Sequence, residues 1–291
     1  MATTFGLDIS HHQDPPLDLE QCAREGIDFV FIKATEGSNY QDPAFRPNLA
    51  EAQRAGLIPA AYHYVRAAAT AAAQVDNVKR TVPPGVPVIP DIEDGSGDVP
   101  LAREVVQRLE AAGYRVPLMY LPRWYWQRLG SPSLAGLPPL WSSRYPDNVV
   151  GSIADEIADV LTSYWTGYGG LDVAVLQFTS SSRIAGRQPI DANAYRGTRD
   201  QLAALLGGTE EDMAGEGQNI LAAVLTGGDS TRSITFDDVS GQVKLPLGVD
   251  PTALLGRLAD VQFALTKTLP RILEELEALR ADVAALKGEP Q

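Results

Sequence analysis

The stretch Val86-Pro87-Val88-Ile89-Pro90-Asp91-Ile92-Glu93-Asp94-Gly95 decides how the fold is interpreted. A short apolar run that ends in acids and glycine is typical of a buried strand that carries carboxylates to the end of a sheet and then turns. Residues two apart in a strand point the same way, so Asp91 and Glu93 are expected to project together, their backbones roughly 6.6 Å apart. Ile92 would face the opposite layer, and Asp94 would begin the turn.

Two carboxylates at about this separation can divide the work of acid–base chemistry. The more crowded or desolvated carboxyl keeps its proton and acts as an acid, while the better solvated one stays ionised. Cleavage of a glycosidic bond uses such a pair. A second interpretation stays open, because Asp94-Gly95-Ser96-Gly97 is also ordinary turn composition and acids at a strand end are often only solvated.

Composition bounds the class of protein. The 291 residues are enough for one large α/β domain and a smaller appendage, and 44% of them are apolar, which predicts an ample core. The net charge of −13 argues against a nucleic-acid partner, whose phosphates would repel the protein. Cys22 is the single cysteine, which excludes an intramolecular disulfide, and its helical setting indicates a small buried residue rather than a nucleophile.

Neither membrane insertion nor export by a standard signal is expected. No run of about 18 apolar residues occurs. The segment Met1 to Asp8 lacks the basic and then apolar pattern of a signal peptide. We therefore expect synthesis in the cytosol and, for a substrate beyond the membrane, a separate route of release.

Strand and helix patterns alternate along residues 1–206. The predicted strands cover residues 5–10, 29–34, 59–65, 86–93, 116–120, 140–145, 173–178 and 190–193, and the predicted helices cover 17–25, 47–55, 67–82, 101–112 and 199–206. Regular alternation implies parallel strands with right-handed crossovers, and about eight strands predict a barrel.

The carboxyl ends of barrel strands form one mouth, where active sites lie. Polar and aromatic residues recur at the predicted strand ends. This recurrence is stronger evidence for a site than any one of these residues is by itself. The residues expected around the mouth are Asp8, Glu36, His63, Asp91, Glu93, Tyr120, Trp141, Gln177 and Asp191.

A change of composition follows the predicted barrel. Residues 207–249 contain glycine pairs and read as a linker or small segment to which we assign no chemistry. Asp250-Pro251 is a good helix start. From Leu269 to Leu286 apolar residues recur at alternating spacings of about 3 and 4, a short heptad seam. We expect a homodimer through residues 250–287, although a helix that packs on its own domain would show the same pattern.

The strand ends resemble those of glycoside hydrolase family 25, the Chalaropsis-type lysozymes or muramidases common among phage endolysins. The resemblance covers about residues 3–206, and its order and spacing are more specific than any single motif. The motifs that carry it are Gly6-Leu7-Asp8-Ile9-Ser10-His11-His12-Gln13, Phe31-Ile32-Lys33-Ala34-Thr35-Glu36-Gly37, Tyr62-His63-Tyr64, Asp91-Ile92-Glu93, Leu176-Gln177-Phe178 and Ile190-Asp191-Ala192-Asn193.

This resemblance implies a modified TIM-like (β/α) barrel that cleaves the β-1,4 bond between N-acetylmuramic acid and N-acetylglucosamine in peptidoglycan, without a metal or other cofactor. Glu93 would be the general acid, and Asp91 would orient or stabilise the intermediate. Asp8 and Asp191 would be the remaining catalytic carboxylates. The residues expected to bind substrate are Tyr62, Tyr64, Glu36, Tyr120, Trp141 and Gln177.

Two features of mechanism and specificity stay open at this level. Carboxyl groups ~5–5.5 Å apart indicate a retaining nucleophile and ~6.5–9.5 Å an inverting pair, but substrate-assisted enzymes break this rule. The resemblance favours retention with participation of the 2-acetamido group. The chain departs from the family pattern at Leu176, where tryptophan is frequent, and at Ser142-Ser143-Arg144, where small residues and a tyrosine are more common. Arg144 so near the mouth would favour an anionic muramyl peptide.

Three other functions compete with this one. A metal-dependent deacetylase is suggested by Asp8, His11, His12 and His63, but no histidine pair has the spacing of a helical metal site. A glycan-binding virion protein without activity would need aromatic residues more than mutually repelling acids. An N-acetylglucosaminidase would cut the same polymer at the other bond. The expected setting is an endolysin made in the host bacterial cytoplasm and released by a holin-type route.

Overall fold

The computed structural model describes residues 2–13 and 16–207. Within them, no helix is long and apolar enough to cross a membrane. Three predictions lie outside the described residues: the linker beyond Gly207, the helices over residues 250–291, and the homodimer through residues 250–287.

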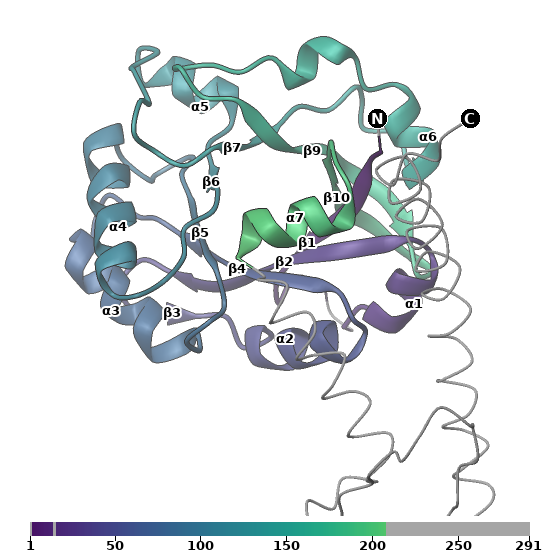
Figure 1. Ribbon diagram of the computed structural model, residues 1–291, viewed down its shortest axis with the longest axis horizontal. Helices are drawn as coiled ribbons and strands as arrows, with labels where there is room; N and C mark the ends of the chain where they lie inside the picture. Colours follow the sequence, from purple (N-terminus) through teal and green to yellow (C-terminus); the bar gives the residue numbers. More distant parts are fainter. Residues whose placement is uncertain (1, 14–15, 208–291) are drawn as a thin grey trace, which may run out of the picture. The chain divides into compact units, whose positions relative to one another are not determined.

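Eight strands close into a barrel (Figure 1). Their order around it is β1-β10-β9-β7-β6-β5-β4-β2, and β2 pairs with β1 to complete the ring. The strands are β1 (Thr4–Ile9), β2 (Ile27–Glu36), β4 (Ile58–Tyr64), β5 (Val88–Asp91), β6 (Met119–Tyr120), β7 (Leu140–Ser143), β9 (Val173–Ile184) and β10 (Arg187–Tyr195). The predicted barrel is therefore confirmed.

The sheet is mixed, which corrects the expectation that all strands are parallel. β10 runs antiparallel to both β9 and β1, whereas β1, β2, β4, β5, β6, β7 and β9 pair in parallel. The reason is the short turn between β9 and β10, in which Ala185 and Gly186 both have positive φ, 47° and 69°. Antiparallel strands can be joined by so tight a turn, but parallel strands need a long crossover.

The helices agree with the predicted segments to within a few residues. They are α1 (Leu19–Arg24), α2 (Phe45–Arg54), α3 (Ala71–Thr81), α4 (Val99–Ala111), α5 (Arg123–Arg128), α6 (Ile153–Ala158) and α7 (Arg199–Leu206). The helix predicted from Ala67 begins later because the Thr70 side chain accepts from the Ala73 N–H and caps it. Five short elements were not predicted because they span only one turn or one bridge: α5, α6, β3 (Tyr40–Gln41), β8 (Gly151–Ser152) and the 3-10 helix η1 (Thr162–Trp165).

Strand alternation divides the core into two layers. Side chains that point into the barrel form an inner cluster, and α7 closes it from one end with Leu202 and Leu206 (Figure 1). The inner cluster comprises Phe29, Phe31, Ala60, Ile89, Leu118, Tyr120, Trp141, Val175, Leu202 and Leu206. Intervening residues such as Val30, Ile32 and Ile92 pack outward against the helices.

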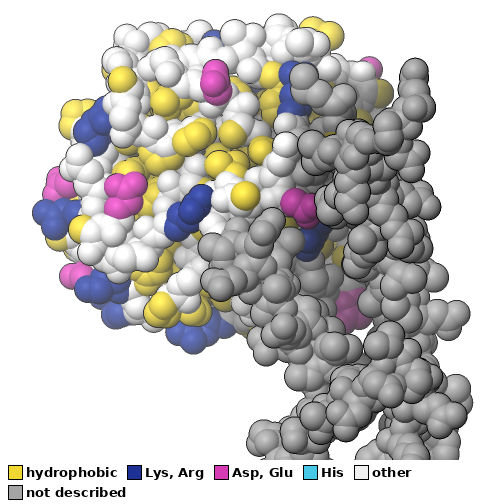
Figure 2. Space-filling model, in the orientation of Figure 1, with side chains coloured by type: hydrophobic (Ala, Val, Ile, Leu, Met, Phe, Trp, Pro, Cys, Tyr) yellow, Lys and Arg dark blue, Asp and Glu magenta, His cyan; other side chains and the backbone are white. Residues whose placement is uncertain are grey.

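α7 covers the end where the parallel strands begin, since its leucines pack with Phe29, Ile89 and Leu118. Figure 2, in the same orientation, shows acidic and basic side chains interspersed among uncharged ones, as on an ordinary solvated surface. The opposite end of the barrel, where the parallel strands finish, is left for the site.

Candidate active site

β5 places the central acids. Asp91 is its last residue and points into the barrel like Ile89, while Ile92 packs in the outer layer as predicted. Glu93 lies beyond the strand, in a turn fixed by Ser96, whose Oγ accepts from the Glu93 N–H (3.0 Å) and donates to the Val65 carbonyl (2.8 Å). The turn, rather than strand alternation, therefore sets the direction of Glu93.

Asp94 takes no part in this group. Its carboxylate pairs with Arg128 at 2.7 Å, and its side chain is 70% exposed. The expectation that Asp94 only begins the turn is confirmed.

Asp8 and Asp191 meet across the antiparallel pair of β1 and β10, where they are register partners. Asp8 Oδ2 accepts from Gln177 Nε2 (2.8 Å) and Asn193 Nδ2 (2.7 Å). Burial raises the pKa of Asp8 to about 6 although both amide donors oppose it. Burial, together with the charges of Asp8 and Glu93, raises the pKa of Asp191 to about 8. The barrel thus keeps two carboxyls close together at reduced acidity.

Asp91 is the most strongly perturbed acid of the group. It is 5% exposed, and its Oδ1 is buried without a hydrogen-bond partner among the described residues. Burial, and then the charge of Glu93, raise the pKa of Asp91 well above its usual value. An unpartnered buried oxygen costs about 1–3 kcal/mol, so its retention marks a site that a ligand can complete.

Glu93 faces more open surroundings than Asp91. Burial raises the pKa of Glu93, and the nearby Tyr64 hydroxyl, whose proton is donated to the Asp94 carbonyl (2.8 Å) in this structure, opposes this rise. The expected protonated Glu93 agrees with that direction. The expected ionised Asp91 does not match its surroundings, because Asp91 is the more deeply buried of the two.

Tyrosines surround the acids. Tyr62 is partly buried near Asp8, Asp91 and Asp191, and desolvation of its hydroxyl raises the pKa of that hydroxyl well above the usual value, so it stays protonated. Tyr120 and Tyr145 both donate to Gln177 Oε1, at 3.1 and 2.6 Å, and so anchor the amide that holds Asp8.

Trp141 forms the floor of the site rather than its wall. It is 2% exposed, donates from Nε1 to Asn193 Oδ1 (2.7 Å), and packs edge-on against Phe31 and Tyr62. The face of the Trp141 ring is therefore covered, and Trp141 supports Asn193 and Tyr62 from below.

Glu36, which was expected to bind substrate, forms salt bridges with two basic residues. Its Oε2 pairs with Lys33 Nζ at 2.7 Å, and its Oε1 with Arg66 Nη2 at 2.6 Å. Partial burial raises the pKa of Glu36, but the hydrogen bonds from Lys33 and Arg66 outweigh this effect and the net shift is downward. Tyr64 lies between the same cations, 5.1 Å from Lys33 Nζ and 4.1 Å from the Arg66 guanidinium carbon, measured to the ring centroid.

The prediction that His63 lies at the barrel mouth is wrong. It points outward to the helical layer, where its ring contacts Thr35 Oγ1 (2.7 Å) and Gln74 Oε1 (3.2 Å). Burial lowers its pKa to about 4, so it is neutral. Strand alternation explains the error, since Tyr62 and Tyr64 point inward and His63 between them cannot. Within the described residues, no group of three His, Cys, Asp or Glu could hold a metal ion.

Sequence reasoning did not assign Lys33, Asn193, Arg66 or Tyr145 to the site. Lys33 and Asn193 could have been found, because each stands two residues beyond an inward residue, Phe31 and Asp191. Tyr145 lies in the loop after β7, where no sequence pattern predicts the direction of a side chain.

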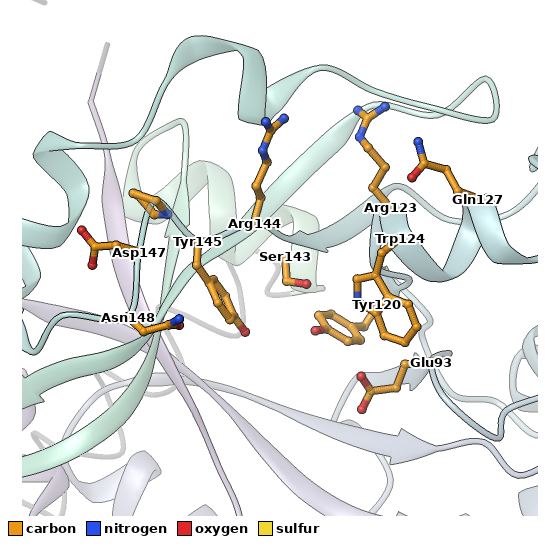
Figure 3. Close-up of a pocket in the computed structure, with 11 residues that line it drawn as sticks. Glu93, Tyr120, Arg123, Trp124, Gln127, Ser143, Arg144, Tyr145, Asp147 and Asn148 are labelled. Atoms are coloured by element: carbon orange, nitrogen blue, oxygen red, sulfur yellow. The ribbon is translucent and has the colours of Figure 1, made fainter.

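An open cavity of about 790 Å³ begins at Glu93 (Figure 3). Tyr120, Tyr145 and Trp124 form its aromatic wall near Glu93, and Arg123 and Arg144 line it farther out. A cleft of this size, with aromatic faces beside a proton-holding carboxyl, suits a carbohydrate chain.

Comparisons with known proteins agree with this chemistry. Residues 7–187 match the family model described as Glycosyl hydrolases family 25. Lysozyme M1 of Streptomyces globisporus is 42% identical over 72 residues, which are 24% of this chain and 24% of that protein. The match therefore spans about a quarter of the lysozyme's length.

Longer matches are less identical. The uncharacterized protein YegX of Escherichia coli strain K12 is 26% identical over 227 residues, 72% of this chain and 75% of YegX. The solved structure of a muramidase from Trichobolus zukalii superposes with a TM-score of 0.58 at 27% identity, over 71% of this chain and 100% of that one.

Proposed function

The chain belongs to glycosyl hydrolase family 25, and on that premise we propose that it is a muramidase, cleaving the β-1,4 bond between N-acetylmuramic acid and N-acetylglucosamine of bacterial peptidoglycan. The observation that carries the proposal is the combination of Glu93, a carboxyl of raised pKa at the cavity, with Asp91, whose buried Oδ1 has no donor among residues 2–13 and 16–207.

Glu93 supplies the proton in the first step. Its carboxyl protonates the glycosidic oxygen as the bond from that oxygen to C1 breaks, so the leaving sugar departs as a neutral alcohol. Burial keeps the Glu93 proton available at a higher pH than a solvated glutamate would allow.

Asp91 orients the substrate's 2-acetamido group. The acetamido N–H is the donor that Asp91 Oδ1 lacks, and such a bond favours the ionised carboxylate. The acetamido carbonyl oxygen then bonds to C1 and forms a cyclic oxazolinium ion. Water, deprotonated by the Glu93 carboxylate, next attacks C1 and opens the ring, with net retention of configuration.

Asp8, whose pKa of about 6 leaves it largely ionised at neutral pH, places negative charge near the reacting carbon, while Asp191, with a pKa of about 8, keeps its proton beside it. An oxocarbenium-like centre is stabilised by carboxylates held in a water-poor site. Gln177 and Asn193 fix the direction of Asp8, so little reorganisation is needed when charge develops at C1.

The reaction is tested with purified cell walls and mass spectrometry of the soluble products. Muramic acid at the reducing end is expected, and glucosamine at that end would instead identify an N-acetylglucosaminidase. Glu93→Gln is expected to lower kcat by about 100-fold or more, and Asp91→Asn by a comparable factor. Asp94→Asn is the matched control, since its exposed carboxylate lies next to Glu93 in sequence but pairs with Arg128. Release of reducing ends by Glu93→Gln at the parent rate would overturn the assignment.

We further propose an endolysin setting, in which protein made in the host bacterial cytoplasm reaches the wall through a holin-type route. The support is the resemblance of the strand ends to a family common among phage endolysins. Expression in a bacterial cytoplasm with and without a co-expressed holin tests it, and lysis is expected only with the holin. Equal lysis without one would contradict it.

A further inference from the structure

Two arginines line the cavity that begins at Glu93. Arg123 is the first residue of α5, and Arg144 follows β7 directly. Both line the cavity, and Figure 3 shows their side chains extending in the same direction, away from Glu93, with Ser143 between them. Two guanidinium groups from different elements therefore lie along one side of the cleft.

Each guanidinium is held in place by an aromatic ring. The Arg144 guanidinium lies over the Tyr164 ring at 4.1 Å from its centroid, and that of Arg123 over the Tyr168 ring at 4.4 Å. Arg123 also donates to the Thr166 carbonyl. Such contacts restrict the side chains before any ligand binds, which lowers the entropy that binding must overcome.

Neither arginine has an acidic partner in the part of the chain that the structure describes. By contrast, Arg66, Arg108 and Arg128 each pair with a carboxylate. The one other acid that lines the outer cavity, Asp147, lies on the far side of Tyr145 from Arg123 in Figure 3. In a chain of net charge −13, two oriented and unpaired guanidiniums in one cleft are an uncommon concentration of positive charge.

We propose that Arg123 and Arg144 form a carboxylate-binding subsite for the lactyl side of the muramyl residue, and so determine which wall chemistry the enzyme prefers. The sugar rings of peptidoglycan are uncharged, but the lactyl group of muramic acid ends in a free carboxylate or carries a peptide stem with carboxylates of its own. Guanidinium groups match a carboxylate with two parallel hydrogen bonds. This subsite rests on the proposed function.

Trp124 extends the same surface. It is 48% exposed, follows Arg123 in α5 and stands edge-on to Tyr125, with ring centroids 5.5 Å apart. An exposed indole beside a guanidinium gives the apolar part of a muramyl peptide a face to pack on while its carboxylate is bound.

Three substrates prepared from one wall separate the possible sources of the carboxylate. They are glycan with intact stems, the same glycan with stem carboxylates converted to amides, and glycan from which an amidase has removed the stems and left lactyl carboxylates. The variants are Arg123→Gln, Arg144→Gln and the double variant. Arg108→Gln on α4 is the matched control, because it removes an exposed arginine that pairs with Glu104.

The double variant is expected to lose roughly 10- to 100-fold in kcat/KM on the substrate that carries the recognised carboxylate. The parent should lose a similar factor when that carboxylate is converted to an amide, and the double variant should then lose nothing more. A loss confined to stem-bearing glycan identifies a stem carboxylate. A loss confined to stem-free glycan identifies the lactyl carboxylate, which is an amide wherever a stem is attached, and a loss on both shows that the subsite accepts either. Equal kcat/KM of parent and double variant on all three substrates would overturn the subsite, and so would a loss of the same size on amidated glycan.

Binding separates this proposal from the proposed function. Calorimetric titration with a disaccharide-peptide should show an affinity that falls with added salt in the parent and is about 10-fold weaker in the double variant. If the parent cleaves none of the substrates, the muramidase assignment fails. If it cleaves them but salt-dependent binding persists in the double variant, only the subsite fails. Melting curves of the variants check that the lost ring contacts have not unfolded the chain.

Discussion

Asp8 and Asp191 face each other across β1 and β10, and both hold a proton to a higher pH than a solvated aspartate. Asp91 and Glu93 are shifted in the same direction. Four neighbouring acids cannot all ionise cheaply in a buried site, so the chain sacrifices stability for a group of carboxyls that can exchange protons near neutral pH. Two consequences can be measured at single residues.

Asp191→Asn should stabilise the protein at alkaline pH. The pKa of Asp191 is about 8 in the folded protein and about 3.9 in an unfolded chain, so the folded state binds more protons between these values. The protonated Asp191 carboxyl therefore contributes its full stabilisation of the folded state below about pH 4, and this stabilisation is lost as the pH rises through 8. The melting temperature of the variant should exceed that of the parent by about 3 °C or more at pH 9 and differ little at pH 4. Asp94→Asn, the exposed control, should show no such pH dependence, and a parent as stable as Asp191→Asn at pH 9 would contradict the prediction.

Lys33→Met should move the alkaline limb of the activity profile. Burial raises the pKa of Glu93, and the ammonium group of Lys33 lowers it. Removal of that charge also leaves the Glu36 carboxylate paired with Arg66 alone, so less of its negative charge is compensated. The pH at which kcat falls by half should rise by roughly 0.5–1 unit. Lys79→Met removes an exposed lysine that pairs with Asp76 and should leave the profile unchanged. An unchanged or acid-shifted limb in Lys33→Met would show that Lys33 does not act on Glu93.

At the scale of elements, short connections decide where the site residues point. β5 ends at Asp91, and the turn after it carries Glu93. The two-residue turn at Ala185 and Gly186 reverses the chain and brings Asp191 opposite Asp8. Strands deliver residues to the mouth, but these connections set their mutual arrangement.

Ser96→Ala tests the turn after β5. The Ser96 hydroxyl is fully buried and bonds both the Glu93 N–H and the Val65 carbonyl. Its loss should lower the free energy of unfolding by about 1–3 kcal/mol. It should lower kcat by roughly 10-fold or more with little change in KM, because Glu93 loses its position while the cleft remains. Ser133→Ala removes a hydroxyl at a surface turn and is the control. A stability loss without any change in kcat would mean that Ser96 is structural only.

At the scale of the whole molecule, the barrel has one closed end and one functional end. α7 packs into the end where the strands begin, and Arg115 secures it by donating to the Ala204 and Leu205 carbonyls at 2.9 and 2.8 Å. The inner cluster therefore separates the stabilising end of the barrel from the acids at the other.

Leu202→Ala should destabilise the barrel without changing its chemistry. Leu202 is fully buried in the inner cluster, so its truncation should cost about 2–4 kcal/mol in the free energy of unfolding. Leu205→Ala, on the same helix but only partly buried, should cost less. Denaturant titration measures both, and kcat of the folded fraction should equal that of the parent. Equal costs for the two leucines would contradict the proposed closure by α7.

Self-association stays a prediction from the heptad seam at residues 269–286. Light scattering of the full chain should give twice the monomer mass of 31.2 kDa. Leu276→Lys together with Leu279→Lys, two seam positions, should give the monomer mass because charges disrupt such a seam. Glu274→Lys together with Glu275→Lys is the matched control on charged positions outside the seam. A parent at monomer mass would end this prediction.

The sequence by itself determined the barrel, its strand ends and the central acids. Alternation over Val88–Asp91 is local, since Asp91 stands two residues past Ile89 in the same strand and must point to the same side. The same rule would have turned His63 outward.

Only the tertiary structure decided what depends on contacts between distant residues. The antiparallel course of β10, the closeness of Asp8 and Asp191, the pairing of Glu36 with Lys33 and Arg66, and the placement of Arg123 and Arg144 along one cavity belong to this class. Charge and burial act through space, so a pKa or a free guanidinium is fixed by neighbours that can lie more than a hundred residues away in the chain, as Gln177 and Asn193 do from Asp8.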